Sequence, residues 1–174
     1  MVITLWFPMC AESAAGTGEH GHFFLFAAPG TATPEASAAI TGVRTPANTT
    51  LVHVGGGGEA TLTRVWGIGT DFGGLTPTRG AGTIASISVS AFVHPLPHDR
   101  LRLDPYLTLG YNWFVRDATR QRLGAASAGG GLNYWITPPA QSRLGVKVEF
   151  RDYMRPGQDR LRFSEVRVGV CLSQ

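Results

Sequence analysis

The chain has 174 residues, enough for a single domain with one enclosed core, and its formal net charge is +3. Its 23 glycines, together with few lysines and glutamates, favour a β protein. Hydrophobic residues make up 43% of the chain but never form the run of about eighteen that a membrane helix needs, which excludes an α-helical membrane protein. The 15 lysines and arginines are dispersed, so they indicate no nucleic-acid partner.

The N-terminal segment is interpreted as an incomplete signal peptide or a disordered leader, spanning residues 1–21. Met1–Met9 is apolar, and Cys10–Ala15 is small and polar, as at a signal-peptidase site. The basic start of a signal peptide is absent. The folded domain is therefore expected to span residues 22–174.

Eight segments alternate apolar and polar residues with a period of two, which predicts β-strands with two unlike faces. In the clearest one, Leu103–Arg116, the odd positions are apolar and the even positions are mostly polar or small. In chain order the expected strands cover residues 22–28, 50–62, 65–72, 84–94, 103–116, 125–136, 143–151 and 166–172. Upstream of Ser164 the parity reverses, since Leu161 and Phe163 are odd, which predicts a bulge or a strand that leaves the membrane there.

The connections contain glycine, proline and polar residues. Gly30–Thr49 is expected to be a long mobile loop, whereas Thr63-Arg64 is a tight turn. No helix of useful length is expected between the strands, which excludes βαβ units and a parallel sheet.

The polar face of the strands decides between a membrane barrel and a soluble one. It is rich in glycine and serine and carries few charges, which suits the narrow interior of an eight-stranded barrel. The apolar face ends in tyrosine and tryptophan, as in lipid-facing strands. The candidate lumen charge network is Glu59, Asp71, Lys147, Glu149, Arg151 and Arg167. The candidate interfacial aromatics are Trp66, Tyr111, Trp113 and Tyr134.

The predicted fold is therefore all-β: a closed, eight-stranded, antiparallel up-and-down transmembrane barrel. The alternative is a soluble, lipocalin-like barrel that binds a small apolar ligand in its lumen. The two folds predict opposite directions for Leu107, Leu109, Val146 and Val148.

Several motifs resemble the small OmpA/OmpX-like barrels of the outer-membrane β-barrel domain family. Leu103–Arg116 (LDPYLTLGYNWFVR), Gly129–Trp135 (GGGLNYW) and Val146–Asp152 (VKVEFRD) occur in that order and resemble the C-terminal half of such barrels. Gly55–Glu59 and Gly67–Phe72 resemble their middle strands, and the similarity covers roughly residues 22 to 172.

This resemblance implies a bacterial outer-membrane location, with outer-membrane lipid and the barrel-assembly machinery as partners and a monomeric state. It also implies short periplasmic turns at Thr63-Arg64, His94–Arg100 and Thr137–Gln141, and lumen positions for Glu59, Glu149 and Arg151. The chain departs from such barrels at its end, Leu172-Ser173-Gln174, where they commonly carry an aromatic residue.

No catalytic, cofactor or metal site is expected. Glu19-His20-Gly21-His22 lacks a third fixed metal ligand and is interpreted as a polar tail. Some barrels of this size are lipid-modifying enzymes with a His/Ser pair and an acid, but no His-x-Ser occurs on a strand here. Whether Cys10 and Cys171 form a disulfide stays open.

The expected function is non-enzymatic: a structural or surface-interaction role, with a lumen filled by side chains rather than an open pore. The loop Gly30–Thr49 is the main candidate for surface contacts.

Overall fold

The computed structural model describes residues 21–42, 47–78, 83–96, 102–116, 121–137, 143–155 and 158–173, and all structural statements below concern these residues. They form eight strands and one helix. The elements are β1 (Gly21–Ala32), α1 (Pro34–Thr41), β2 (Thr49–Thr61), β3 (Trp66–Pro77), β4 (Ile84–Val93), β5 (Leu103–Arg116), β6 (Gln121–Trp135), β7 (Arg143–Arg155) and β8 (Gln158–Ser173). No helix among them is long and apolar enough to cross a membrane.

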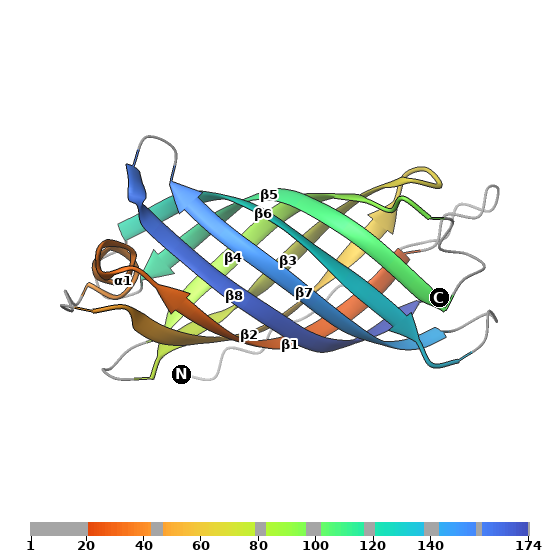
Figure 1. Ribbon diagram of the computed structural model, residues 1–174, viewed down its shortest axis with the longest axis horizontal. Helices are drawn as coiled ribbons and strands as arrows, with labels where there is room; N and C mark the ends of the chain where they lie inside the picture. The colour runs from red at the N-terminus through yellow and green to blue at the C-terminus, as the bar shows by residue number, and fades with distance from the viewer. Residues whose placement is uncertain are drawn as a thin grey trace, which may run out of the picture.

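Each strand pairs antiparallel with the next, and β1 pairs with β8, so the sheet closes into a barrel (Figure 1), which confirms the predicted fold. The register gives the stagger of the strands. From Pro105 the successive partners are Leu132, Val148, Val168, Ala27, Val54, Gly74, Ala85 and Val115. Following these partners once around the barrel returns to β5 at Val115, ten residues beyond Pro105. The strands are therefore steeply tilted around a narrow lumen.

The two ends of the barrel differ. We call the end that holds α1 the helix end (Figure 1) and the opposite end, where β1 begins at Gly21 and β8 ends at Ser173, the termini end. The connections predicted as short turns, around Thr63-Arg64, His94–Arg100 and Thr137–Gln141, all join strands at the termini end. Parts of the latter two lie outside the described residues.

The wall of the barrel is apolar outside and mostly polar inside. Leu107 and Leu109 point outward with 63% and 67% exposure, Val148 is also exposed, and half-buried Val146 shares its face. The soluble alternative required these four side chains to face inward, so it is wrong. A closed barrel with an exposed apolar belt is suited to lipid, which has no hydrogen bonds to offer an open sheet edge.

The segment expected to be a long loop, Gly30–Thr49, is partly ordered structure, so that expectation was wrong. β1 continues to Ala32, and α1 follows. The hydroxyl oxygen of Thr33 caps the helix by accepting a hydrogen bond from the amide of Ala36 (3.3 Å). Gly42 ends the helix with a left-handed φ of 77°, and its amide donates to the carbonyl of Ala38 (2.9 Å).

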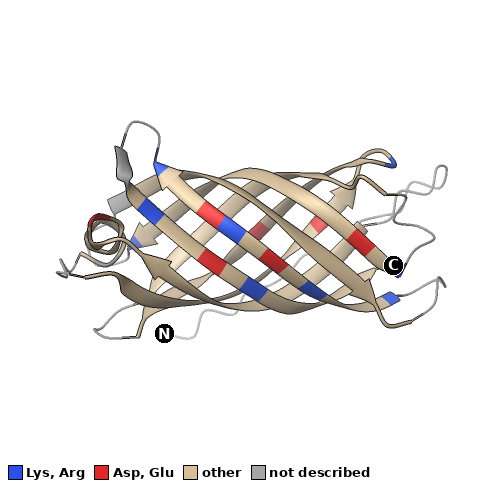
Figure 2. Cartoon of the chain, viewed as in Figure 1, with Lys and Arg blue, Asp and Glu red and all other residues tan. Residues whose placement is uncertain are grey.

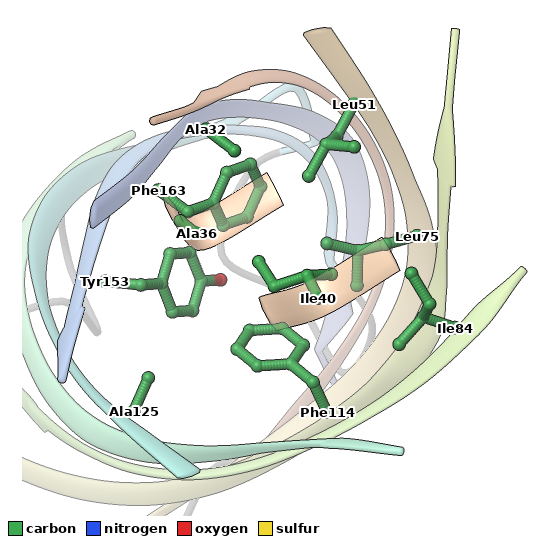
Figure 3. Packing of buried hydrophobic residues seen from close by; sticks show 10 residues of the cluster. All are labelled: Ala32, Ala36, Ile40, Leu51, Leu75, Ile84, Phe114, Ala125, Tyr153 and Phe163. Carbon is green, nitrogen blue, oxygen red and sulfur yellow. The ribbon is translucent and has the colours of Figure 1, made fainter. Parts of the chain in front are cut away.

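Helix α1 lies within the mouth of the barrel and fills it (Figure 3). Ala36 and Ile40, four residues apart, are buried on one side of the helix. We call the buried apolar residues around them the helix-end cluster: Ala32, Ala36, Ile40, Leu51, Leu75, Ile84, Phe114, Ala125, Tyr153 and Phe163. The lumen is therefore apolar at this end and polar below it.

The helix-end cluster also explains the parity of β8. Phe163 faces inward like Glu165 and Arg167, and β8 pairs with β7 without interruption from Arg162 to Ser173. Beyond this stretch the register shifts: Met154 pairs with Arg162, but Arg155 pairs with Gln158. The extra residues of β8 therefore lie between Gln158 and Arg162, upstream of Ser164, where a bulge was predicted.

Candidate functional site

All six charged residues of the candidate lumen network point into the barrel, and none is more than 4% exposed. The structure brings five of them together in the middle of the lumen, on β3, β7 and β8, and places Glu59 in a separate cluster nearer the termini end. Charges of alternating sign follow β7 and β8 along the wall (Figure 2).

The carboxylate of Asp71 joins the two arginines of the network. Its Oδ2 accepts hydrogen bonds from Nη1 of Arg151 (3.0 Å) and from Nη1 of Arg167 (3.1 Å). Asp71 lies on β3, across the lumen from β7 and β8, so these bonds tie opposite walls of the barrel together. Two guanidinium groups in one narrow lumen repel each other unless an acid lies between them.

Each arginine has a second acidic partner two residues before it on its own strand. Arg151 Nε donates to Glu149 (2.5 Å), and Arg167 Nε donates to Glu165 (2.6 Å). A spacing of two keeps both side chains of a pair on the same face of a strand. With Lys147, this central network contains three acids and three bases, which balances its charge.

Two tyrosines complete the hydrogen bonds of these acids. Tyr106 donates to Glu149 (2.8 Å), and Tyr153 donates to Glu165 (2.6 Å) while accepting from Nη2 of Arg167 (2.6 Å). Glu165, Tyr106 and Tyr153 were not predicted from the sequence. Strand parity could have found them, because each lies on the same face of its strand as a residue of the predicted polar face.

Lys147 is held by rings as well as by an acid. Its Nζ lies 3.6 Å from Glu149 and within 4.1–5.3 Å of the ring centres of Phe24, Phe92 and Tyr106. Arg167 likewise lies 4.2 Å from the ring centre of Phe26. Contacts of cations with aromatic faces are strongest where water is excluded, as here.

His53 links Glu165 to Ser86. His53 Nδ1 lies 3.0 Å from Glu165 Oε2, and His53 Nε2 lies 2.8 Å from Ser86 Oγ. The order Ser–His–acid is that of hydrolase triads, and the sequence search could not find it because the three residues lie on three strands. All three side chains are buried beneath the helix-end cluster, and Glu165 is also bonded to Arg167 and Tyr153. No substrate reaches Ser86 in this arrangement.

A second polar cluster surrounds Glu59. His94 Nε2 lies 2.6 Å from Glu59, and His94 Nδ1 lies 2.7 Å from Asp104, which also accepts from Asn133 (3.0 Å). His22 Nε2 lies 3.3 Å from the other oxygen of Glu59. Sequence analysis placed His94 in a turn and His22 in a polar tail, whereas both are buried lumen residues.

Glycines make room for these side chains on the inner wall. A Cβ at Gly131 would overlap the hydroxyl of Tyr106, and one at Gly57 would overlap backbone and side chain of β3 at Thr70 and Asp71. The glycine-rich inner face is thus the space into which large polar groups from other strands extend.

The four candidate interfacial aromatics lie on the outer surface and are exposed. Trp66 begins β3 and Tyr134 is near the end of β6, both at the termini end, while Tyr111 and Trp113 lie toward the helix end of β5. Tyr111 and Trp113 meet edge to face, with ring centres 5.0 Å apart. Their position at a lipid–water interface stays a prediction.

Within the described ranges, no three His, Cys, Asp or Glu side chains are arranged to hold a metal ion. Glu19, His20 and Cys10 lie outside those ranges, and Cys171 is buried in the lumen, so a Cys10–Cys171 bond stays untested.

No protein-family profile and no curated protein matches the chain. Among solved structures, the N-terminal β-barrel domain of Pseudomonas aeruginosa OprF is similar, with 17% identity, 89% of this chain and 97% of that one covered, and a TM-score of 0.62. Neisserial surface protein A is similar at 14% identity, with 87% and 95% covered and a TM-score of 0.58. A de novo designed transmembrane β-barrel is similar at 16% identity, with 88% and 95% covered and a TM-score of 0.51. These likenesses confirm that the chain has the fold of small transmembrane β-barrels.

Proposed function

We propose that this protein is a non-enzymatic β-barrel of the bacterial outer membrane, with a structural or surface-interaction role and a lumen that conducts no solutes. One observation carries the proposal: a closed barrel has an apolar belt outside and a lumen filled by ion pairs, aromatic rings and a helix. Closed barrels of this size with that polarity are the form in which β proteins cross outer membranes.

The filled lumen argues against a general pore. The helix-end cluster fills the lumen near the helix end. Below it, the central network crosses the lumen through the bonds of Asp71 with Arg151 and Arg167. An eight-stranded barrel is only wide enough for side chains to fill its interior.

The connections at the helix end favour a structural role over the display of long loops. Residues 117–120 join β5 to β6, and residues 156–157 join β7 to β8. Half of the longest connection, residues 33–48, is α1, whose buried face is turned into the barrel. A surface contact would therefore involve the rim rather than an extended loop.

The outer-membrane partners follow from this proposal. Lipid would surround the belt, and the barrel-assembly machinery would insert the chain as a monomer after a leader in residues 1–21 has directed export. Each of these remains a prediction.

The membrane assignment can be tested by placing an arginine in the belt. Leu109 lies in the middle of β5 and faces outward, so Leu109→Arg should cost about 2–4 kcal/mol of unfolding free energy in lipid vesicles. Thr31→Arg, on the same outer surface but at the helix end, is the matched control and should cost at most about 1 kcal/mol. Urea unfolding monitored by tryptophan fluorescence measures both, and gel mobility before and after boiling reports the folded barrel. Equal small costs, or a folded monomer without detergent, would contradict the proposal.

A further inference from the structure

Asp152 occupies an outward-facing position of the barrel wall but is itself only 7% exposed. Along β7 the outward positions are apolar from Leu144 to Phe150, and the next outward position is Asp152. Its cross-strand neighbours are Ala128 on β6 and Ser164 on β8. A carboxylate at the edge of an apolar belt costs free energy unless it is paired. The groups that pair with Asp152 therefore indicate what this position does.

Asp152 holds Arg162 in a fixed orientation. Arg162 Nε lies 2.9 and 3.0 Å from the two carboxylate oxygens, and Nη2 lies 2.8 Å from one of them. Ser164 also donates to Asp152 (2.6 Å). The Arg162 side chain nevertheless remains 61% exposed. Asp152 thus fixes one edge of the guanidinium plane, while most of the group stays accessible from outside.

Arg162 lies where the outer surface of the barrel changes from apolar to polar. On β8 the outward residues below it, Val166, Val168 and Val170, are exposed and apolar, whereas Ser164 and Arg162 are polar. Met154 is the cross-strand partner of Arg162 and is exposed, and the next residue, Arg155, is exposed as well. This tip of β7 and β8 therefore carries two exposed arginines, Arg155 and Arg162, beside Asp152.

We propose that Arg162, oriented by Asp152, binds the phosphate of a membrane lipid in the leaflet around the helix end, whose acyl chains lie on Phe150, Met154 and Val166. This inference rests on the proposed membrane function. A guanidinium with one edge fixed offers its remaining N–H groups as a preorganised fork for a phosphate. A ligand that contacts both this fork and the apolar residues below it must be amphiphilic, which selects a lipid over free phosphate.

Native mass spectrometry of the folded protein in a nonionic detergent tests this site with three probes: phosphatidic acid, diacylglycerol and inorganic phosphate. Phosphatidic acid should be retained in preference to the other two. Arg162→Gln should weaken its binding about tenfold, the equivalent of about 1.4 kcal/mol. Arg102→Gln removes the same charge from an exposed position at the termini end and should change binding less than about twofold. Equal binding by the two variants, or equal retention of diacylglycerol or inorganic phosphate, would overturn the proposal.

Arg162→Lys distinguishes a fork from a simple charge. Lysine keeps the charge but not the planar pair of donors, so binding of phosphatidic acid should still fall several-fold. Binding at the wild-type level would overturn the role of the fork. Gel mobility before and after boiling is recorded for each variant. If all variants fold in lipid but none loses phosphatidic acid, the lipid site is wrong and the membrane function stands, whereas failure of the wild type to fold in lipid refutes the membrane function itself.

Discussion

Asp71 illustrates how a single lumen residue affects the whole barrel. Its carboxylate lies between Arg151 and Arg167, which come from different strands and are at most 1% exposed. A buried ion pair contributes little net stability compared with an apolar core, but removal of one partner leaves an uncompensated charge. The cost of changing Asp71 is therefore larger than the cost of losing two hydrogen bonds.

Replacement of Asp71 by asparagine should lower the unfolding free energy by about 3–5 kcal/mol, because the acid between the two buried guanidinium groups is lost and the network keeps three bases against two acids. Urea titration in detergent micelles, followed by tryptophan fluorescence, measures the change. Glu35→Gln removes the same charge from an exposed position on α1 and should cost less than about 0.5 kcal/mol. Similar costs for the two variants would show that the central network does not stabilise the fold.

Glycines on the two sides of the wall should respond differently to alanine. A Cβ at Gly169 would overlap the carbonyl of Leu25 at the β1–β8 seam, whereas at Gly58 the nearest atom would be Phe23 Cδ1 at 3.3 Å. Gly169→Ala should therefore cost about 1–3 kcal/mol. Gly58→Ala should be neutral or stabilising by about 0.5 kcal/mol, because alanine loses less backbone entropy on folding. The same urea titration compares them, and a larger loss at Gly58 would contradict this account.

At the scale of elements, alternation predicted all eight strands, because outward side chains meet one environment and inward side chains another. The ends of the strands were predicted less well. β3 was expected to end at Phe72 but continues to Pro77, since Leu75 packs into the helix-end cluster. Inward positions that are apolar, such as Leu75 and Phe163, break the expected contrast between the two faces.

Helix α1 could not be predicted because its signals are short. Its eight residues carry two buried apolar side chains, Ala36 and Ile40, in a segment rich in alanine, threonine and proline. Isolated helices of this length are unstable, so α1 depends on the barrel mouth for its stability. Partners such as Glu59 and His94 were also unpredictable, because they meet only when the barrel closes.

Ile40→Ala should release α1 without unfolding the barrel. The loss of buried apolar contact, about 2–4 kcal/mol, is large compared with the stability of a single eight-residue helix. Hydrogen exchange should show amides of residues 36–41 exchanging faster, while amides of β1 and β8 remain protected. Glu35→Ala, on the exposed side of the helix, should leave exchange unchanged. Loss of protection throughout the strands would mean that α1 and the barrel unfold together.

At the scale of the whole molecule, two separate groups of side chains close the lumen: the helix-end cluster around α1 and the central ion-pair network. If residues 34–41 are replaced by a glycine–serine segment of equal length, the helix-end cluster is lost but the ion pairs of Asp71 with Arg151 and Arg167 remain. Planar-bilayer recordings should therefore show no steady conductance above that of the wild type. A wide porin in the same membrane is the positive control. A stable open channel in the replacement variant would show that α1 alone closes the barrel.

The contacts of α1 also bear on the order of folding. Thr33 exchanges hydrogen bonds with Arg162, 129 residues away, and Ile40 packs in the same cluster as Phe163. These partners become available only when the last strand has joined the first, which is the slowest kind of contact for a chain to form. Docking of α1 should accordingly be a late kinetic step, and a fluorescent probe on the helix would time the moment at which the barrel closes.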